Sequence, residues 1–113
     1  MATRITIDDV GSLWVIRADG AVIGESRNAL VLNEDGYDPV IYFPRDDIAM
    51  AFLDRSDKTT HCPHKGDATY YSIQTGNGTI RDAAWSYEHP RDDVARIAGH
   101  IAFHADQVAV EEL

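Results

Sequence analysis

The sequence predicts a single, mainly β domain with one short helix near its C-terminus. Short apolar or alternating runs recur along the chain, and turns rich in glycine, asparagine and aspartate separate them. Only the segment that begins near Asp92 spaces its apolar residues as a helix does. The 113 residues contain no second hydrophobic block, so residues 1–113 are expected to form one domain with one core.

The N-terminal half alternates strand signals with turns. Asp19-Gly20 supplies the positive φ that a tight hairpin turn requires, and Asn33 to Gly36 form a second turn. Residues 48–53 fit a strand or a helical turn equally well. Strands are expected at residues 4–7, 13–17, 22–23, 28–32 and 40–43.

The C-terminal half contains the clearest hairpin of the chain. Two strand runs, 68–74 and 79–87, flank the turn Thr75-Gly76-Asn77-Gly78. A charged loop is expected before them at 54–58. The helix that begins near Asp92 is expected to place Val94, Ala95, Ile97, Ala98 and Ile101 on its apolar positions, with Gly99 limiting its length. A last strand is expected at 106–110, and the sheet is expected to curl on itself so that its edges are hidden.

Composition restricts the partners and the compartment. The net charge of −9 repels phosphates and anionic lipid surfaces, so neither nucleic acid nor membrane is expected as a partner. No window approaches the roughly 20 apolar residues that span a bilayer, and the N-terminus does not resemble a signal peptide. The single cysteine cannot form an intramolecular disulfide. We therefore expect a cytoplasmic protein.

The stretch His61-Cys62-Pro63-His64-Lys65-Gly66-Asp67 concentrates more reactive side chains than any other window. A nearby ammonium or imidazolium would favour the thiolate of the cysteine, and a histidine oriented by a carboxylate could act as a base. The catalytic candidates are Cys62, His64, Lys65 and Asp67, with His61 as an alternative base. A lone cysteine is more often a small buried residue, so a structural motif is the alternative.

A structural zinc ion is not expected, and no metal-binding residues are assigned. His61, Cys62 and His64 are permitted zinc ligands, and His100 and His104 have the spacing of a helical metal pair. No paired Cys-x-x-Cys accompanies them, however, and Gly99 disfavours a helix at that place. The sequence leaves any other cofactor open.

Aromatic and basic residues supply candidates for a binding cleft. Rings such as Trp14, Tyr42, Trp85 and Tyr87 could wall a pocket or fill a small β core. The phosphate-binding pattern Gly-x-x-x-x-Gly-Lys-Ser/Thr is absent. Lys65 could still meet an anion together with Arg45 and Arg81 if the fold brings the three together. The ligand-binding candidates are Arg45, Lys65, Trp85 and Tyr87.

Four segments together resemble the family called domain of unknown function 427. They are Tyr42 to Ile48, Thr60 to Tyr70, Ala84 to Tyr87 and Ile97 to Phe103, in this order across nearly the whole chain. The resemblance implies a Mss4-like fold, also called a β-tent. Relatives of that fold hold zinc through two Cys-x-x-Cys pairs, which a chain with one cysteine cannot provide. Some family members are labelled nucleotidyltransferase, but neither a phosphate-cradling glycine loop nor a metal-binding acid pair supports that label here.

Our leading hypothesis is a small soluble domain that binds a small molecule in a cleft beside the Cys-Pro-His-Lys-Gly motif. The first alternative is an enzyme, through nucleotidyl transfer or through thiol chemistry at Cys62. The second is a structural or protein-interaction domain. The sequence fits a monomer or a homodimer, since an exposed strand edge permits both.

Overall fold

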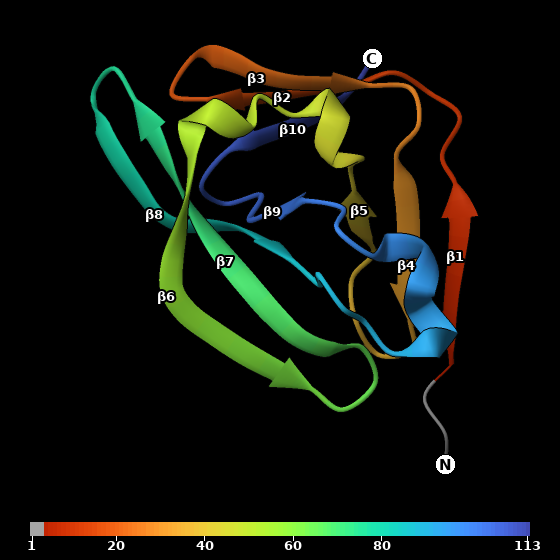
Figure 1. Ribbon diagram of the computed structural model, residues 1–113. Helices are drawn as coiled ribbons and strands as arrows, with labels where there is room; N and C mark the ends of the chain where they lie inside the picture. The colour runs from red at the N-terminus through yellow and green to blue at the C-terminus, as the bar shows by residue number, and fades with distance from the viewer. Residues whose placement is uncertain (1–3) are drawn as a thin grey trace.

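A computed structural model describes residues 4–113, and across these residues the chain is built mainly from antiparallel strands (Figure 1). The three helical segments are short 3-10 turns, so the prediction of a mainly β fold is confirmed. The strands are β1 (Ile5–Asp9), β2 (Trp14–Ala18), β3 (Ala21–Ser26), β4 (Leu30–Glu34), β5 (Val40–Tyr42), β6 (Leu53–Cys62), β7 (Gly66–Thr75), β8 (Gly78–Ser86), β9 (Ala102–Phe103) and β10 (Ala109–Glu112). The helices are η1 (Arg45–Asp47), η2 (Met50–Phe52) and η3 (Asp92–Ile97).

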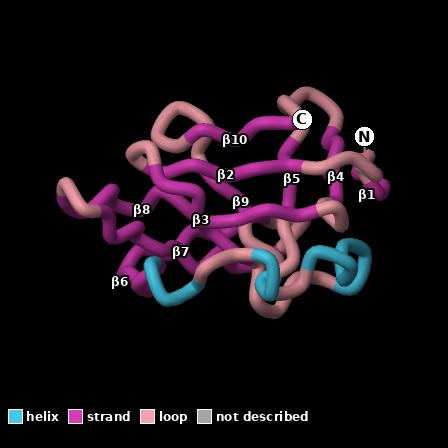
Figure 2. Tube along the Cα trace, turned by 90° about the horizontal axis from the view of Figure 1, so that it is seen from above, coloured by secondary structure: helices cyan, strands magenta, loops and turns pink. Residues whose placement is uncertain are grey.

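The strands form three small sheets rather than one curled sheet. Their orders are β1-β4-β5, β10-β2-β3 and β6-β7-β8-β9. Two isolated bridges add to them: Phe43, which follows β5, pairs with Ile101, which precedes β9, and Gly24 of β3 pairs with Ile48 between η1 and η2. In Figure 2 the helical segments lie along one side of the molecule, outside the strands. The Mss4-like assignment of this arrangement stays a prediction.

Two apolar clusters fill the space between the sheets. The larger cluster joins β2 and β3 to β7, β8 and β9 through residues such as Ile16, Phe43 and Ile73, which are fully buried. The smaller cluster joins β4 and β5 to β7, β8 and η3, and it includes Tyr42 and Tyr87. These two tyrosines also reach the cavity described below, so the smaller cluster forms its floor.

Both tight hairpins occur where the sequence predicts them. Asp19 and Gly20 have φ values of 52° and 85° between β2 and β3, as a turn with two positive φ angles requires. Gly76 and Asn77 connect β7 to β8. The Asp19 carboxylate accepts hydrogen bonds from Thr75 Oγ1 (3.2 Å) and Asn77 Nδ2 (2.6 Å), so the two hairpin tips support each other.

The predicted loop at 54–58 is wrong, because these residues belong to the ten-residue strand β6. β6 pairs only with β7 and lies at the edge of its sheet, with an irregularity in the pairing between Arg55 and Thr59. Most of its side chains are exposed. Charged side chains on an edge strand are compatible with pairing and discourage association with other chains.

The predicted helix begins at Asp92 as expected but is shorter, and the last strand is displaced. The helix ends at Ile97, and Gly99 follows with a φ of 70°. Ile101 is therefore extended, and its backbone exchanges two hydrogen bonds of 2.8 Å with Phe43. After it, the His104 carbonyl accepts from the backbone of Gln107 and Val108, so a turn occupies the start of the predicted strand 106–110. The last strand, β10, begins at Ala109.

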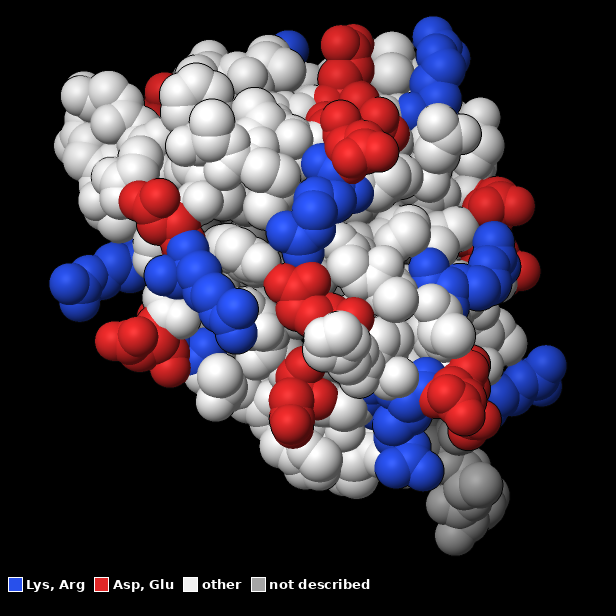
Figure 3. Space-filling model, viewed as in Figure 1, with Lys and Arg blue, Asp and Glu red and all other residues white. Residues whose placement is uncertain are grey.

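The surface carries charges of both signs. On the face shown in Figure 3, acidic and basic side chains are interspersed, and neither sign forms a continuous patch. Among residues 4–113, no helix has the length and the apolar character needed to cross a bilayer.

Candidate functional site

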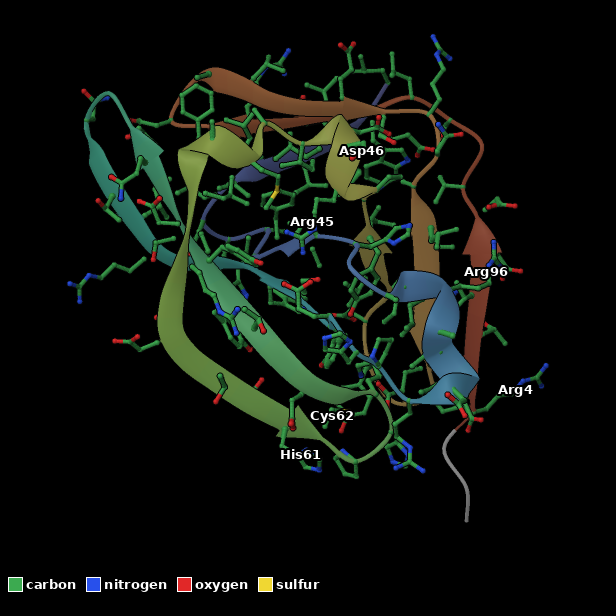
Figure 4. All side chains as sticks on the ribbon, viewed as in Figure 1. Arg4, Arg45, Asp46, His61, Cys62 and Arg96 are labelled. Carbon is green, nitrogen blue, oxygen red and sulfur yellow. The ribbon has the colours of Figure 1, made fainter. Side chains whose placement is uncertain are left out.

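The motif residues 61–67 form the tip of the β6–β7 hairpin, where Figure 4 shows His61 and Cys62. Cys62 pairs with Gly66, and the Lys65 amide donates to the Cys62 carbonyl at 3.2 Å. Gly66 has a φ of 113°, which only glycine adopts readily. The Lys65 carbonyl accepts from the Arg91 amide at 2.9 Å, so the turn is anchored to the segment before η3.

A cavity of about 570 Å³ lies against this hairpin tip. Its walls come from β4 and the loop after it, from β5, from the β6–β7 turn, from β7 and β8, and from the turn after β9. The lining residues are Leu32, Glu34, Tyr37, Asp38, Val40, Tyr42, Cys62, Pro63, His64, Lys65, Tyr70, Trp85, Tyr87 and His104. Segments distant in the sequence therefore converge on one site.

The aromatic wall follows from strand alternation. Trp85 and Tyr87 are two residues apart, so both point to the cavity side of the sheet, and Tyr70 lies opposite Trp85 in the β7–β8 register. The ring centroids of Trp85 and His104 are 4.7 Å apart, and those of Tyr70 and His104 are 6.3 Å apart with nearly parallel planes. Tyr70, Trp85 and His104 are each only partly buried, so ring surface remains open to the cavity.

Two buried phenols supply neutral polar groups. The Trp85 indole N–H donates to the Tyr42 hydroxyl at 3.4 Å. Burial raises the pKa of Tyr42, and the Trp85 hydrogen bond and the Lys65 charge offset this only in part. Burial also raises the pKa of Tyr87 strongly. Both phenols therefore keep their protons at neutral pH and can donate hydrogen bonds.

An ion pair between Lys65 and Glu34 closes one side of the cavity. Lys65 Nζ lies 2.9 Å from Glu34 Oε1, and the side chains are only 12% and 8% exposed. Burial alone would lower the pKa of Lys65, but the hydrogen bond to Glu34 and the nearby Cys62 thiol and Glu34 carboxylate more than compensate, and the net pKa is raised. The ammonium also lies 5.8 Å from the centre of the Tyr87 ring.

The structure does not bring Arg45 and Arg81 to Lys65. The Arg45 guanidinium donates to Glu88 Oε2 at 2.7 Å and to the Gly99 carbonyl at 3.1 Å, near the centre of the view in Figure 4. Tyr71 completes this network by donating to Glu88 Oε1 at 2.6 Å. Arg81 lines a separate polar groove. Each of the three cations therefore lies in a different environment.

Asp67 also lies outside the cavity. Its carboxylate is 2.7 Å from His61 Nδ1, and the two side chains are exposed at the outer side of the hairpin tip, beside a shallow groove that includes His89. Of the four catalytic candidates, the cavity thus contains Cys62, His64 and Lys65. Of the four ligand-binding candidates, it contains Lys65, Trp85 and Tyr87.

No metal centre is apparent in the described part of the chain. Within residues 4–113 no group of three or more His, Cys, Asp or Glu side chains could hold an ion. His100 follows η3 rather than lying within a helix, and its Nδ1 is 3.2 Å from the Ala98 carbonyl oxygen. His104 instead stacks on Tyr70 and lies against Trp85 at a tilted angle of 45°.

Sequence reasoning missed several cavity residues. The sequence pattern predicts only a turn around Glu34, Tyr37 and Asp38. For Tyr70 it predicts only a strand. The sequence suggests His104 only as a possible zinc ligand. The loop between β4 and β5 could have been noticed, because loops held by a rigid sheet often contribute binding residues.

These features define a small antiparallel β domain with an aromatic cavity at a hairpin tip. A family model described as a domain of unknown function (DUF427) matches residues 6–112. The match covers nearly the whole chain, so the chain belongs to this family, as the four sequence segments predict. The short name of the family model abbreviates nucleotidyltransferase. A comparison with curated proteins found no match.

Proposed function

We propose that this protein binds a small molecule in the aromatic cavity beside the Cys-Pro-His-Lys-Gly motif. The observation that carries the proposal is the convergence of Tyr70, Trp85 and His104 on the same cavity as the Lys65–Glu34 ion pair. Small-molecule sites typically combine apolar walls with a few fixed polar groups, in volumes of about 300–1,000 Å³. The cavity fits this description.

The proposal is tested by thermal unfolding in the presence of a metabolite collection. A ligand of the cavity should raise the melting temperature, because it binds the folded state alone. The rise should disappear in His104→Ala, which removes a ring that contacts Trp85. His100→Ala is the matched control, since this histidine lies outside the cavity. A broad collection that never shifts the melting temperature would contradict the proposal.

A second candidate function is thiol chemistry at Cys62, favoured by one specific contact. Cys62 is partly buried and lines the cavity beside Lys65, and its thiol is one of the groups that raise the pKa of the Lys65 ammonium. Such a contact stabilises a thiolate. Alkylation of Cys62, in which the S–C bond forms as the leaving group of the alkylating reagent departs, should then be fast in the folded protein. Lys65→Met should slow this reaction, whereas equal rates in both proteins would speak against an activated thiol.

Charge and composition support the remaining expectations. The net charge of −9 argues against nucleic acid and anionic membranes as partners. A free cysteine suits a reducing compartment such as the cytoplasm. A protein-interaction role and a homodimer would be detected together by measuring the oligomeric state and by capturing partners.

A further inference from the structure

We infer that the cavity selects a flat aromatic ring that carries a positive charge and discriminates against the same ring with a negative charge. This inference rests on the proposed function, because it specifies what the same cavity binds. It follows from the charges of the lining side chains, from the faces of the aromatic rings and from the protonation of the two buried phenols.

The charged lining residues leave an excess of one negative charge. Among the lining carboxylates and ammonium groups, Glu34 and Asp38 are negative and Lys65 is positive. Glu34 pairs with Lys65 at 2.9 Å, so these two charges offset each other. Within residues 4–113 no ion pair or side-chain hydrogen bond engages Asp38. Its carboxylate is left to meet a ligand.

The aromatic walls also favour a positively charged ligand. The face of an aromatic ring is electron-rich and attracts cations. Two tyrosines of the wall already show this preference, since Lys58 Nζ lies 4.6 Å from the Tyr70 ring centre and Lys65 Nζ lies 5.8 Å from the Tyr87 ring centre. Trp85, the ring that attracts cations most strongly, has no such ammonium over it among the described residues.

An anionic ligand would find few partners in this cavity. Among residues 4–113, Lys65 is the one ammonium that lines it and is already paired with Glu34, and the buried phenols Tyr42 and Tyr87 offer neutral donors. A triphosphate would bring several negative charges beside Asp38. The charge balance therefore argues against a nucleoside triphosphate as the occupant, whatever the short name of the family suggests.

Three probes with one ring and three charges test this inference. They are 1-methylnicotinamide (cation), nicotinamide (neutral) and nicotinate (anion), titrated at pH 8 and low salt. The chain has two tryptophans, so a ¹H–¹⁵N spectrum contains two indole N–H signals. The Trp85 signal reports the cavity, and Trp14, whose indole nitrogen is buried outside the cavity, is an internal reference. Trp85→Phe assigns the signals.

We expect the Trp85 signal to move with all three probes and the dissociation constant to rise from cation to neutral ring to anion. Each step should be roughly two- to fivefold, because Asp38 is exposed and water screens its charge. Asp38→Asn should reduce the difference between cation and anion. Asp35→Asn is the control, since it removes the same charge from the same loop outside the cavity.

The outcomes separate this inference from the proposed function. If nicotinate binds as tightly as the cation or more tightly, the charge preference is wrong and the cavity remains a ligand site. If the Trp85 signal does not move with any probe at millimolar concentration, the cavity does not take flat rings, and both the inference and the aromatic basis of the proposed function fail. If Asp35→Asn acts as strongly as Asp38→Asn, the selectivity does not come from Asp38.

Discussion

Lys65 Nζ and Glu34 Oε1 lie 2.9 Å apart and connect the β6–β7 turn to the end of β4. The two residues are 31 positions apart in the chain. Their contact therefore joins two different sheets and, at the same time, sets the charge of the cavity wall.

Breaking this pair should destabilise the protein clearly. We expect Glu34→Gln or Lys65→Met to lower the free energy of unfolding by about 2–3 kcal/mol, since either change leaves a poorly solvated group without its partner. The double variant should lose less than the sum of the single variants. Urea denaturation measures all three. Arg96→Ala is the control, because its ion pair with Asp9 is exposed and worth about 0–1 kcal/mol.

Stability should fall at alkaline pH. The folded-state pKa values of Lys65, Tyr42 and Tyr87 are raised, so each group binds its proton more tightly in the folded protein than in the unfolded chain. Their contribution is complete below about pH 10, the unfolded range, and it is lost as the pH rises through the folded pKa values. Urea unfolding between pH 8 and 11 measures the decline, which Tyr87→Phe should make shallower. A decline that Tyr87→Phe leaves unchanged would exclude that tyrosine as a source.

Gly66 should tolerate no side chain without strain. We expect Gly66→Ala to destabilise the protein by about 1–3 kcal/mol, because a φ of 113° is unfavourable for any residue with a Cβ atom. The strain is conformational, since the nearest atom to a Cβ at this position is the His89 carbonyl oxygen at 3.5 Å. Gly76→Ala is the control, as Gly76 has neither a positive φ nor an atom in the way. Equal losses in thermal denaturation would contradict this account.

Truncating Trp85 should cost less than truncating a core ring. Trp85 is partly buried and faces the cavity, whereas Phe43 is fully buried. We expect Phe43→Ala to lower the free energy of unfolding by about 3–5 kcal/mol and Trp85→Ala by about 1–3 kcal/mol. Chemical denaturation compares the two variants. A loss for Trp85→Ala as large as that for Phe43→Ala would place this ring in the core rather than on a binding wall.

Local chemistry made much of the fold predictable. Asp19-Gly20 marks its turn because few residues adopt two positive φ angles, and Gly78, with a φ of 129°, marks the start of β8 after the turn at Gly76-Asn77. The strand β6, in contrast, is not predicted by its local sequence. Its charged residues carry no local strand signal, and they are extended because β7 lies beside them.

The sequence predicts those residues of the site that lie in a conspicuous local segment. Lys65, Trp85 and Tyr87 lie in short segments rich in reactive or aromatic residues, which by themselves indicate a binding site. All three line the cavity. Glu34 and His104 are brought there by strand pairings between distant parts of the chain, which periodicity does not reveal. Arginine often binds anionic ligands, but the Arg45 guanidinium donates its hydrogen bonds to Glu88 and Tyr71 instead.

The pairing of β10 with β2 affects how the protein can be made. Ala109 lies opposite Arg17 and Glu112 lies opposite Trp14, so one sheet needs residues from both ends of the chain. While the chain is being synthesised, β2 and β3 leave the ribosome long before β10, and the β2 edge has no partner during that interval. This sheet therefore cannot be completed before β10 has been synthesised, and until then the nascent protein exposes an open strand edge to chaperones and to other chains.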